Sequence, residues 1–158
     1  NLSRYDGIRY GMSIRKNDIH EMYTKTRDLG FGNEVKRRII LGTFVLSSGY
    51  YDNYFAKAQK VRNLIRQDFV RAFQDVDILL TPTTPYLPFK IGEKINDPLQ
   101  MYLADIFTVP ISLAGVPALN IPCGYSSKGF PIGLQLISNY FNENTLFNLS
   151  MYLENNYN

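Results

Sequence analysis

The sequence has no tryptophan, one cysteine and one histidine among its 158 residues. A single cysteine, Cys123, excludes a disulfide within the chain and fits a reducing compartment. With His20 as its one histidine, the chain cannot form the usual zinc site of several cysteines and histidines. No apolar run approaches about 20 residues, the length of a membrane-spanning helix, and no signal peptide is visible. We therefore expect no membrane association.

Neither sign of charge dominates the sequence, because 17 basic and 14 acidic residues leave a net charge of only +3. Such a mild excess is compatible with an RNA-associated enzyme but does not indicate nucleic-acid binding by itself. The usual phosphate-loop, dinucleotide and metal motifs are absent, so we expect no cofactor in this chain. Hydrophobic residues make up 45% of the chain, which predicts one domain with a core. Because the first residue is Asn1, we expect a segment of a longer protein.

Hydrophobic periodicity and turn residues predict an α/β or α+β chain. We expect helices at about 19–29, 33–46, 52–73, 97–107 and 143–152, and strands at 77–81, 118–122 and 132–137. The apolar stretch 39–46 predicts a helix buried on most of its surface. The strand at 77–81 is expected to be buried and parallel, because a helix precedes it. The last two strands are expected to form a hairpin through the turn at 124–129.

Helix boundaries follow from capping residues. Asp18, Asp52 and Asp97 each precede a helical pattern and are expected to cap its first turn. Pro98 then takes the first helical position of the fourth helix, and Pro110 limits that helix. Ser47 and Ser48, before Gly49, are expected to end the second helix.

Arg38 is the first candidate binding residue. It stands beside Arg37 at the start of a helix that is apolar on most faces, which favours a partly buried guanidinium. A buried arginine, with its planar set of donors, is suited to holding a carboxylate through two hydrogen bonds. The alternative is a surface ion pair with Glu34, four residues earlier, and the residues alone do not decide between the two.

Asp105 is the second candidate. It is expected near the C-terminal end of its helix among apolar neighbours, where a carboxylate opposes the helix dipole. Such a local penalty often marks a functional constraint. The alternative is a helix-end carboxylate turned to water. An aspartate that holds an ammonium and an arginine that holds a carboxylate would together recognise a free α-amino acid.

Other chemistry-bearing residues are better explained by structure. Ser126, Ser127 and Lys128 are consecutive in a turn, where three side chains rarely converge on one point, and a catalytic lysine must be desolvated. His20 has no partner at a recognisable spacing, so we expect it on the surface. Cys123 is expected to be a small buried side chain.

Several segments resemble the amidase signature family, and among its members the glutaminase subunits of the Glu-tRNA(Gln) and Asp-tRNA(Asn) amidotransferases, known as their A subunits. The matching segments are Asn1–Gly11, Gly30–Asp52, Ala58–Arg62, Thr81–Pro85, Asp97–Tyr102, Leu113–Pro117 and Pro131–Ile137. The resemblance covers nearly the whole chain. It implies the C-terminal portion of the amidase signature fold, α/β with a mixed sheet flanked by helices, so that residues 1–158 are a partial amidase domain.

The same resemblance implies a function. The family's catalytic residues, two serines and a lysine, would lie upstream of this chain, which alone would be inactive. Arg38, rather than Arg37, would bind the α-carboxylate of glutamine, and Asp105 would bind its α-amino group. Ammonia released from glutamine would pass within a complex of A, B and C subunits, where a partner subunit uses ATP and Mg to amidate Glu-tRNA(Gln) for translation. The place would be the bacterial cytoplasm or an organellar matrix or stroma.

Two alternatives stay open. One is a general amidase of the same family that hydrolyses another carboxamide. The other is a non-catalytic RNA-binding or assembly module, which would use the basic residues Lys57, Lys60, Arg62, Arg66 and Arg71 of the third helix. Such a row is more often a solvated helix face.

Overall fold

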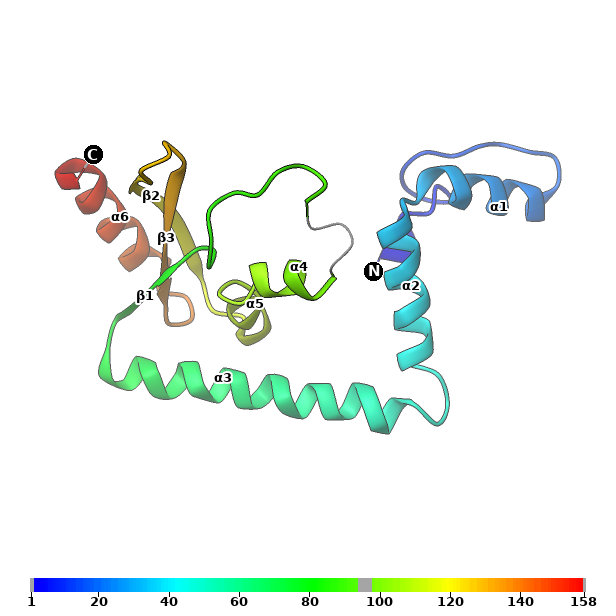
Figure 1. Ribbon diagram of the computed structural model, residues 1–158. Coiled ribbons are helices and arrows are strands. Elements are labelled where there is room, and N and C mark those ends of the chain that lie inside the picture. The colour runs from blue at the N-terminus through cyan, green and yellow to red at the C-terminus, as the bar shows by residue number, and fades with distance from the viewer. Residues whose placement is uncertain (1, 94–97, 158) are drawn as a thin grey trace. The chain divides into compact units, whose positions relative to one another are not determined.

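The computed structural model describes residues 2–93 and 98–157, and Figure 1 shows the order of its elements. The chain divides into two compact units, Asn1–Gln59 and Lys60–Asn158. Each unit is described by itself below. The expected helix cap Asp97 lies outside the described residues.

The first unit is helical. Its elements are η1 (Leu2–Tyr5), α1 (Ile19–Gly30), α2 (Asn33–Val45) and a π-helical turn, η2 (Tyr51–Ala56), which continues into α3 (Lys57–Asp75). Asp18 caps α1 as predicted, since its carboxylate accepts a hydrogen bond from the Glu21 amide at 3.0 Å. Asp52 is not a cap, contrary to our prediction: it lies inside η2, which begins one residue earlier.

One ion pair fixes the N-terminal segment of this unit to α1. Arg27 on α1 donates to the Asp6 carboxylate through Nε at 3.1 Å and Nη2 at 2.8 Å, while Asp6 is buried. Thr26, 1% exposed, accepts from the Ile14 amide at 3.0 Å. A Cβ on Gly7 would lie 1.9 Å from the Met12 carbonyl oxygen, so this close crossing of the backbone requires glycine.

The prediction that α2 is buried was wrong for this chain. None of its residues is buried, and Ile40, Leu41 and Phe44 are 70%, 56% and 44% exposed. The helix is apolar around most of its circumference, as the sequence indicates. Within the described residues, however, Phe44 contacts the rings of Tyr50 and Tyr54 while Ile40 and Leu41 stay largely exposed, because burial depends on a packing partner and not on the helix's own composition.

The second unit is built on a three-stranded sheet. Its strands are β1 (Ile78–Pro82), β2 (Ala118–Tyr125) and β3 (Pro131–Ser138), in the order β1-β3-β2. The predicted β2–β3 hairpin is confirmed, and β3 is the central strand. The predicted parallel, buried strand at 77–81 was wrong on both counts. β1 pairs antiparallel with β3 at the sheet edge, and Leu80 is 56% exposed. The chain between β1 and β3 is long enough to allow either parallel or antiparallel pairing, so the preceding helix does not decide the strand direction.

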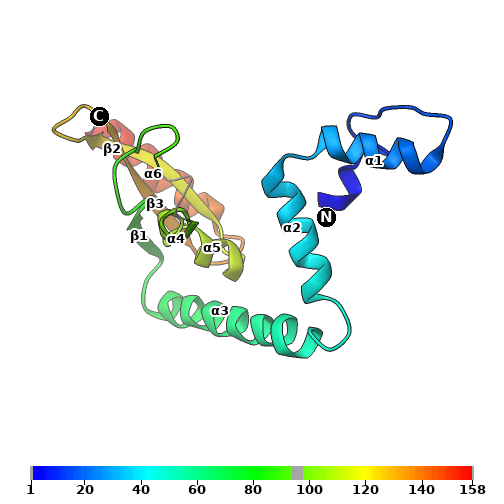
Figure 2. The ribbon, with the colours of Figure 1, turned by 45° about the vertical axis from the view of Figure 1, so that its right-hand side comes forward.

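Alternate residues of β3 build two apolar layers, one on each face of the sheet. Leu136 packs with Ile121 and with Leu146 of the last helix, α6 (Glu143–Tyr157). Ile137 points to the other face and packs with Ile111 of α5 (Val109–Ala114). Phe69 and its helical neighbours Ile65 and Phe73 on α3 add to that second layer. Figures 1 and 2 show α6 against the sheet and α5 close to its other side.

The segment after β1 carries the element that our prediction missed. α4 (Pro98–Ala104) ends before Asp105, a turn occupies 105–108, and α5 follows. Pro110 does not end a helix, as we expected, but sits at the start of α5, where its missing amide costs nothing. Gly115, with φ of 78°, ends α5 by donating to the Ile111 carbonyl at 2.9 Å. Among the described residues, no helix is long and apolar enough to cross a membrane.

Candidate functional site

Arg38 lies near the start of α2 and is exposed. Its Nε donates to Glu34 Oε1 at 3.0 Å, and its side chain is 64% exposed. The guanidinium is therefore not partly buried in this chain, contrary to what the apolar pattern indicated, and the surface pair with Glu34 forms. The pair involves Nε, so the terminal nitrogens of Arg38 have no hydrogen-bond partner among residues 2–93 and 98–157. Those two nitrogens remain available to a carboxylate ligand.

Glu34 contacts both Arg37 and Arg38. Its second carboxylate oxygen lies 3.6 Å from Nη1 of Arg37. The pKa of the Glu34 carboxyl is lowered, first because Arg38 donates a hydrogen bond to it and also because Arg37 lies nearby. The carboxylate thus stays ionised and holds Arg38 in an orientation that Arg37 does not share, since Arg37 contacts it only at the longer distance.

Asp105 is the first residue of the turn that follows α4, and its side chain is exposed. Its backbone is held by hydrogen bonds: its amide donates to the Tyr102 carbonyl at 3.1 Å, and its carbonyl accepts from the amides of Thr108 and Val109, both at 3.0 Å, and from Thr108 Oγ1 at 3.2 Å. Its carboxylate has no partner among the residues that the structure describes. A fixed backbone with a free carboxylate is a suitable acceptor for an ammonium group.

Gln135 connects the turn after Asp105 to the sheet, and the sequence pattern assigned it no role. It is 6% exposed on β3, and its Nε2 donates to the Phe107 carbonyl and to Thr81 Oγ1, each at 3.0 Å. A polar residue between apolar neighbours in a buried strand was the available signal, because such a residue must find partners.

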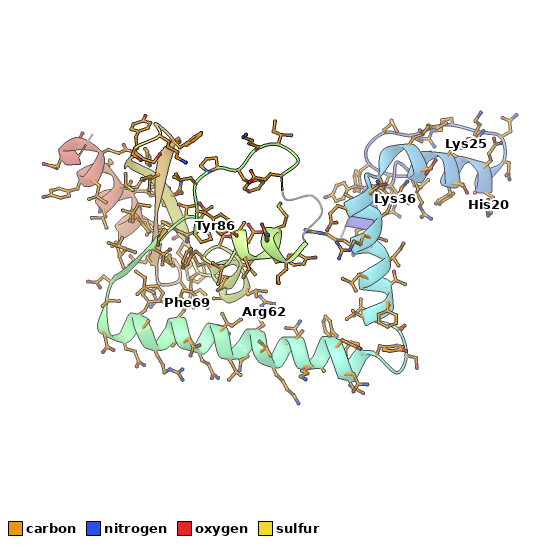
Figure 3. All side chains as sticks on the ribbon, in the orientation of Figure 1. His20, Lys25, Lys36, Arg62, Phe69 and Tyr86 are labelled. Carbon is orange, nitrogen blue, oxygen red and sulfur yellow. The ribbon has the colours of Figure 1, made fainter. Side chains whose placement is uncertain are left out.

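The serines and the histidine that we set aside have structural roles or lie on the surface, as predicted. Ser126 closes the β2–β3 turn, its Oγ accepting from the Phe130 amide at 3.1 Å. Ser47 Oγ donates to the Phe44 carbonyl at 2.6 Å where α2 ends. His20 is exposed and lies on α1 (Figure 3). Cys123, however, is exposed and not buried as we expected. It lies on the edge strand β2 between Pro122 and Tyr125, where the pairing with β3 shifts its register.

The basic row of α3 is partly used inside the second unit. Arg62 Nε donates to the Leu113 carbonyl at 2.8 Å, and Figure 3 shows this side chain and Phe69 on α3. Arg66 donates to the Tyr140 hydroxyl at 3.2 Å and lies over its ring, and Arg71 pairs with Asp68. Several of the cations that an RNA-binding face would need are therefore engaged within the chain.

A metal site is not evident in the part of the chain that the structure describes, where no group of three or more His, Cys, Asp or Glu residues converges. Arg38 belongs to the first unit and Asp105 to the second, so each is characterised in its own surroundings. The pairing of these two residues around one ligand remains a prediction.

Comparisons with known proteins agree on one family. Residues 1–147 match the family described as Amidase. The A subunit of the glutamyl-tRNA(Gln) amidotransferase of Persephonella marina is 62% identical over 151 residues, which cover 95% of this chain and 31% of that protein. The corresponding protein of Thermodesulfovibrio yellowstonii is 59% identical over 150 residues, again 95% of this chain and 31% of the relative. The chain thus spans about a third of the length of these relatives.

Solved structures show the same relationship. The crystal structure of the A subunit of glutamyl-tRNA(Gln) amidotransferase from Thermotoga maritima matches with a TM-score of 0.64 and 47% identity, over 87% of this chain and 30% of that one. A crystal structure of an amidase matches with a TM-score of 0.64 and 27% identity, over 89% of this chain and 32% of that one. The predicted fold class is confirmed by these neighbours, although the three-stranded sheet of the described residues is antiparallel and not mixed. The chain belongs to the amidase family.

Proposed function

We propose that this chain is the glutamine-recognising part of a glutaminase subunit of a tRNA-dependent amidotransferase. The identity of 62% and 59% to two glutamyl-tRNA(Gln) amidotransferase A subunits supports the choice of this branch of the family. The observation that carries the role in recognition is Arg38, an exposed guanidinium oriented through Nε by Glu34 while its terminal nitrogens stay unbonded among the described residues.

Arg38 and Asp105 divide the recognition of glutamine between them. The terminal nitrogens of Arg38 bind the α-carboxylate through two parallel hydrogen bonds, a geometry that lysine cannot reproduce. The Asp105 carboxylate, on its fixed turn, binds the α-ammonium. Held at its two charged ends, glutamine keeps its side-chain amide free for attack, and positioning of this kind lowers the entropic cost of the reaction.

Catalysis uses groups that this chain does not supply. In the proposed scheme a serine nucleophile, a second serine and a lysine base, the residues typical of the family, come from the remaining part of the subunit. An acyl-enzyme forms with release of ammonia, and water then releases glutamate. The ammonia serves a partner subunit that amidates Glu-tRNA(Gln) with ATP and Mg, in a complex of A, B and C subunits of the bacterial cytoplasm or an organelle.

The experiment uses the whole complex and compares two nitrogen donors. Arg38→Ala and Asp105→Ala should each lower kcat/KM for glutamine by at least about thirtyfold, because removing one member of a desolvated charged pair costs about 2–5 kcal/mol. Amidation of Glu-tRNA(Gln) with ammonium chloride should keep its native rate, because free ammonia bypasses glutamine recognition. Unchanged glutamine use in either variant would contradict the site assignment. Preferred hydrolysis of a different carboxamide by the native protein would favour a general amidase.

A further inference from the structure

The turn that presents Asp105 is tied to the central strand by a single buried side chain. Nε2 of Gln135 on β3 reaches the Phe107 carbonyl, two residues after Asp105 in the same turn, at 3.0 Å. The second hydrogen of that nitrogen goes to Thr81 Oγ1 on β1, also at 3.0 Å. Both donors of the amide are therefore used, and the side chain is 6% exposed.

Strand register explains why Gln135 is in position to do this. Thr81 on β1 and Asn120 on β2 are its direct partners across the sheet, so the three residues form one row on the same face. Ile137, two residues further along β3, faces the same side and packs with Ile111 of α5. The 105–108 turn is thus held at two points: α5 fixes its end by apolar packing, and Gln135 fixes its middle by a hydrogen bond.

The other hydrogen bonds of the turn, among the residues that the structure describes, are local. The Asp105 carbonyl accepts from the amides of Thr108 and Val109 at 3.0 Å, and from Thr108 Oγ1 at 3.2 Å. These bonds define the shape of the turn but do not attach it to the sheet. The bond from Gln135 does attach it, and without this donor the Phe107 carbonyl must find another partner or turn toward water.

We propose that Gln135 is a positioning residue for Asp105, which sets the location of its carboxylate and thereby the affinity for the α-ammonium of the amino-acid substrate. The inference rests on the proposed function, in which Asp105 meets that ammonium. Gln135 itself does not touch the substrate in this scheme. Its substitution therefore changes substrate binding through the turn and leaves the chemical step alone.

Two variants of the whole protein test this role. Gln135→Met keeps the length of the side chain and removes both donors, and Gln135→Glu keeps the shape but places acceptor oxygens against the Phe107 carbonyl. Each should raise KM for glutamine at least tenfold with kcat within about twofold of native. Ser138→Ala is the control, since Ser138 is buried on the same strand and donates to the Asn142 carbonyl at 3.1 Å, away from the turn. Its KM should stay native.

A second arm separates positioning from general stability. In an Asp105→Ala background, Gln135→Met should raise KM no further, because the group through which it acts is gone. Two results would overturn the role of Gln135 and leave the proposed function intact. One is a further tenfold increase in KM when Gln135→Met is added to Asp105→Ala. The other is a native KM in the Gln135 variants although Asp105→Ala raises KM. A native KM in Asp105→Ala itself would overturn both. If Gln135→Glu does not fold, Gln135→Met decides alone.

Discussion

Arg38 and Glu34 lie one helical turn apart on α2, with 3.0 Å between Arg38 Nε and Glu34 Oε1. The same carboxylate lies 3.6 Å from Arg37 Nη1, so two adjacent arginines share one acidic partner at different distances. This relationship gives Arg38 a defined orientation while its terminal nitrogens stay unbonded among the described residues. The ion pair on the helix surface is therefore compatible with the proposed binding of a substrate carboxylate by Arg38.

The asymmetry between the two arginines predicts different responses to the same substitution. Arg38→Lys keeps the charge but removes the planar pair of donors, so KM for glutamine should rise at least tenfold. Arg37→Lys, the adjacent matched control, should leave KM within about twofold of native. Steady-state glutaminase assays on the whole protein measure both. Equal effects at the two positions would show that general positive charge, and not Arg38, attracts the substrate.

The buried Asp6 carboxylate should make the first unit sensitive to acid. Its pKa is lowered from the ordinary 3.8, first because Arg27 donates a hydrogen bond to it. Since the folded pKa is below the unfolded one, the stabilising contribution is complete above about pH 4 and is lost as the pH falls through the folded value. Because Arg27 is half exposed, we expect a contribution on the order of 1 kcal/mol.

Chemical denaturation of the protein and of Asp6→Asn at pH 7 and pH 3 measures this contribution. The variant should be less stable at pH 7, and the difference should shrink at pH 3. Asp28→Asn, which removes a carboxylate that is 74% exposed and paired with Lys36, should change stability less at either pH. A difference for Asp6→Asn that grows in acid would contradict the assignment, because the sign of the pKa shift would then be reversed.

Gly7 and Gly11 separate two reasons for requiring glycine. Both have positive φ, at 82° and 86°, but a Cβ would meet the Met12 carbonyl oxygen at 1.9 Å only at Gly7, whereas at Gly11 the nearest heavy atom is 3.6 Å away. Gly11→Ala should cost about 1–2 kcal/mol from backbone strain alone. Gly7→Ala should cost at least about 3 kcal/mol, because steric overlap is added. Thermal unfolding of both variants measures the difference, and equal losses would show that the crossing at Gly7 relaxes freely.

The uncovered apolar side chains of α2 predict that the 158-residue chain associates when it is produced alone. Ile40 and Leu41 are 70% and 56% exposed on this helix, which is more apolar surface than a monomeric helix usually presents. Replacing both by glutamate should reduce association in sedimentation experiments. Ile91→Glu is the control, since Ile91 is fully exposed in a loop and not on an apolar helix. A monodisperse monomer of the unmodified chain would show that α2 is not an interaction surface.

Local signals were sufficient for most elements. Asp18 places the start of α1, and the β2–β3 hairpin follows from two apolar runs around a turn containing Gly124 and Gly129. The direction of β1 was not predictable from local residues, because pairing with β3 is decided by a strand more than fifty residues away. The sequence does not predict α5, because Pro110 is equally suited to limit the preceding helix and to begin a new one.

The candidate site also has a part that the sequence predicts and a part that depends on tertiary contacts. Residue type and position point to Arg38 and Asp105. Among the described residues, the Arg38 side chain is oriented by Glu34 with its terminal nitrogens unbonded, and the Asp105 backbone is held by hydrogen bonds with its carboxylate unbonded. Reasoning from the sequence did not reveal Gln135, because its contribution depends on a hydrogen bond between a strand and a turn that are far apart in the chain. Burial was the weakest inference: an apolar sequence makes a side chain suited to burial, but the partner that covers it is not encoded in the same helix.

The most direct test of glutamine recognition removes the two charged groups from the substrate. Glutamine is compared with 4-carbamoylbutanoate, which lacks the α-amino group, and with 4-aminobutanamide, which lacks the α-carboxylate. The native protein should discriminate against each analogue by at least about thirtyfold in kcat/KM. Asp105→Ala should abolish discrimination against 4-carbamoylbutanoate alone, and Arg38→Ala should abolish it against 4-aminobutanamide alone. Discrimination of native size in both variants would contradict the account, because the charged ends of glutamine would then be read by other residues.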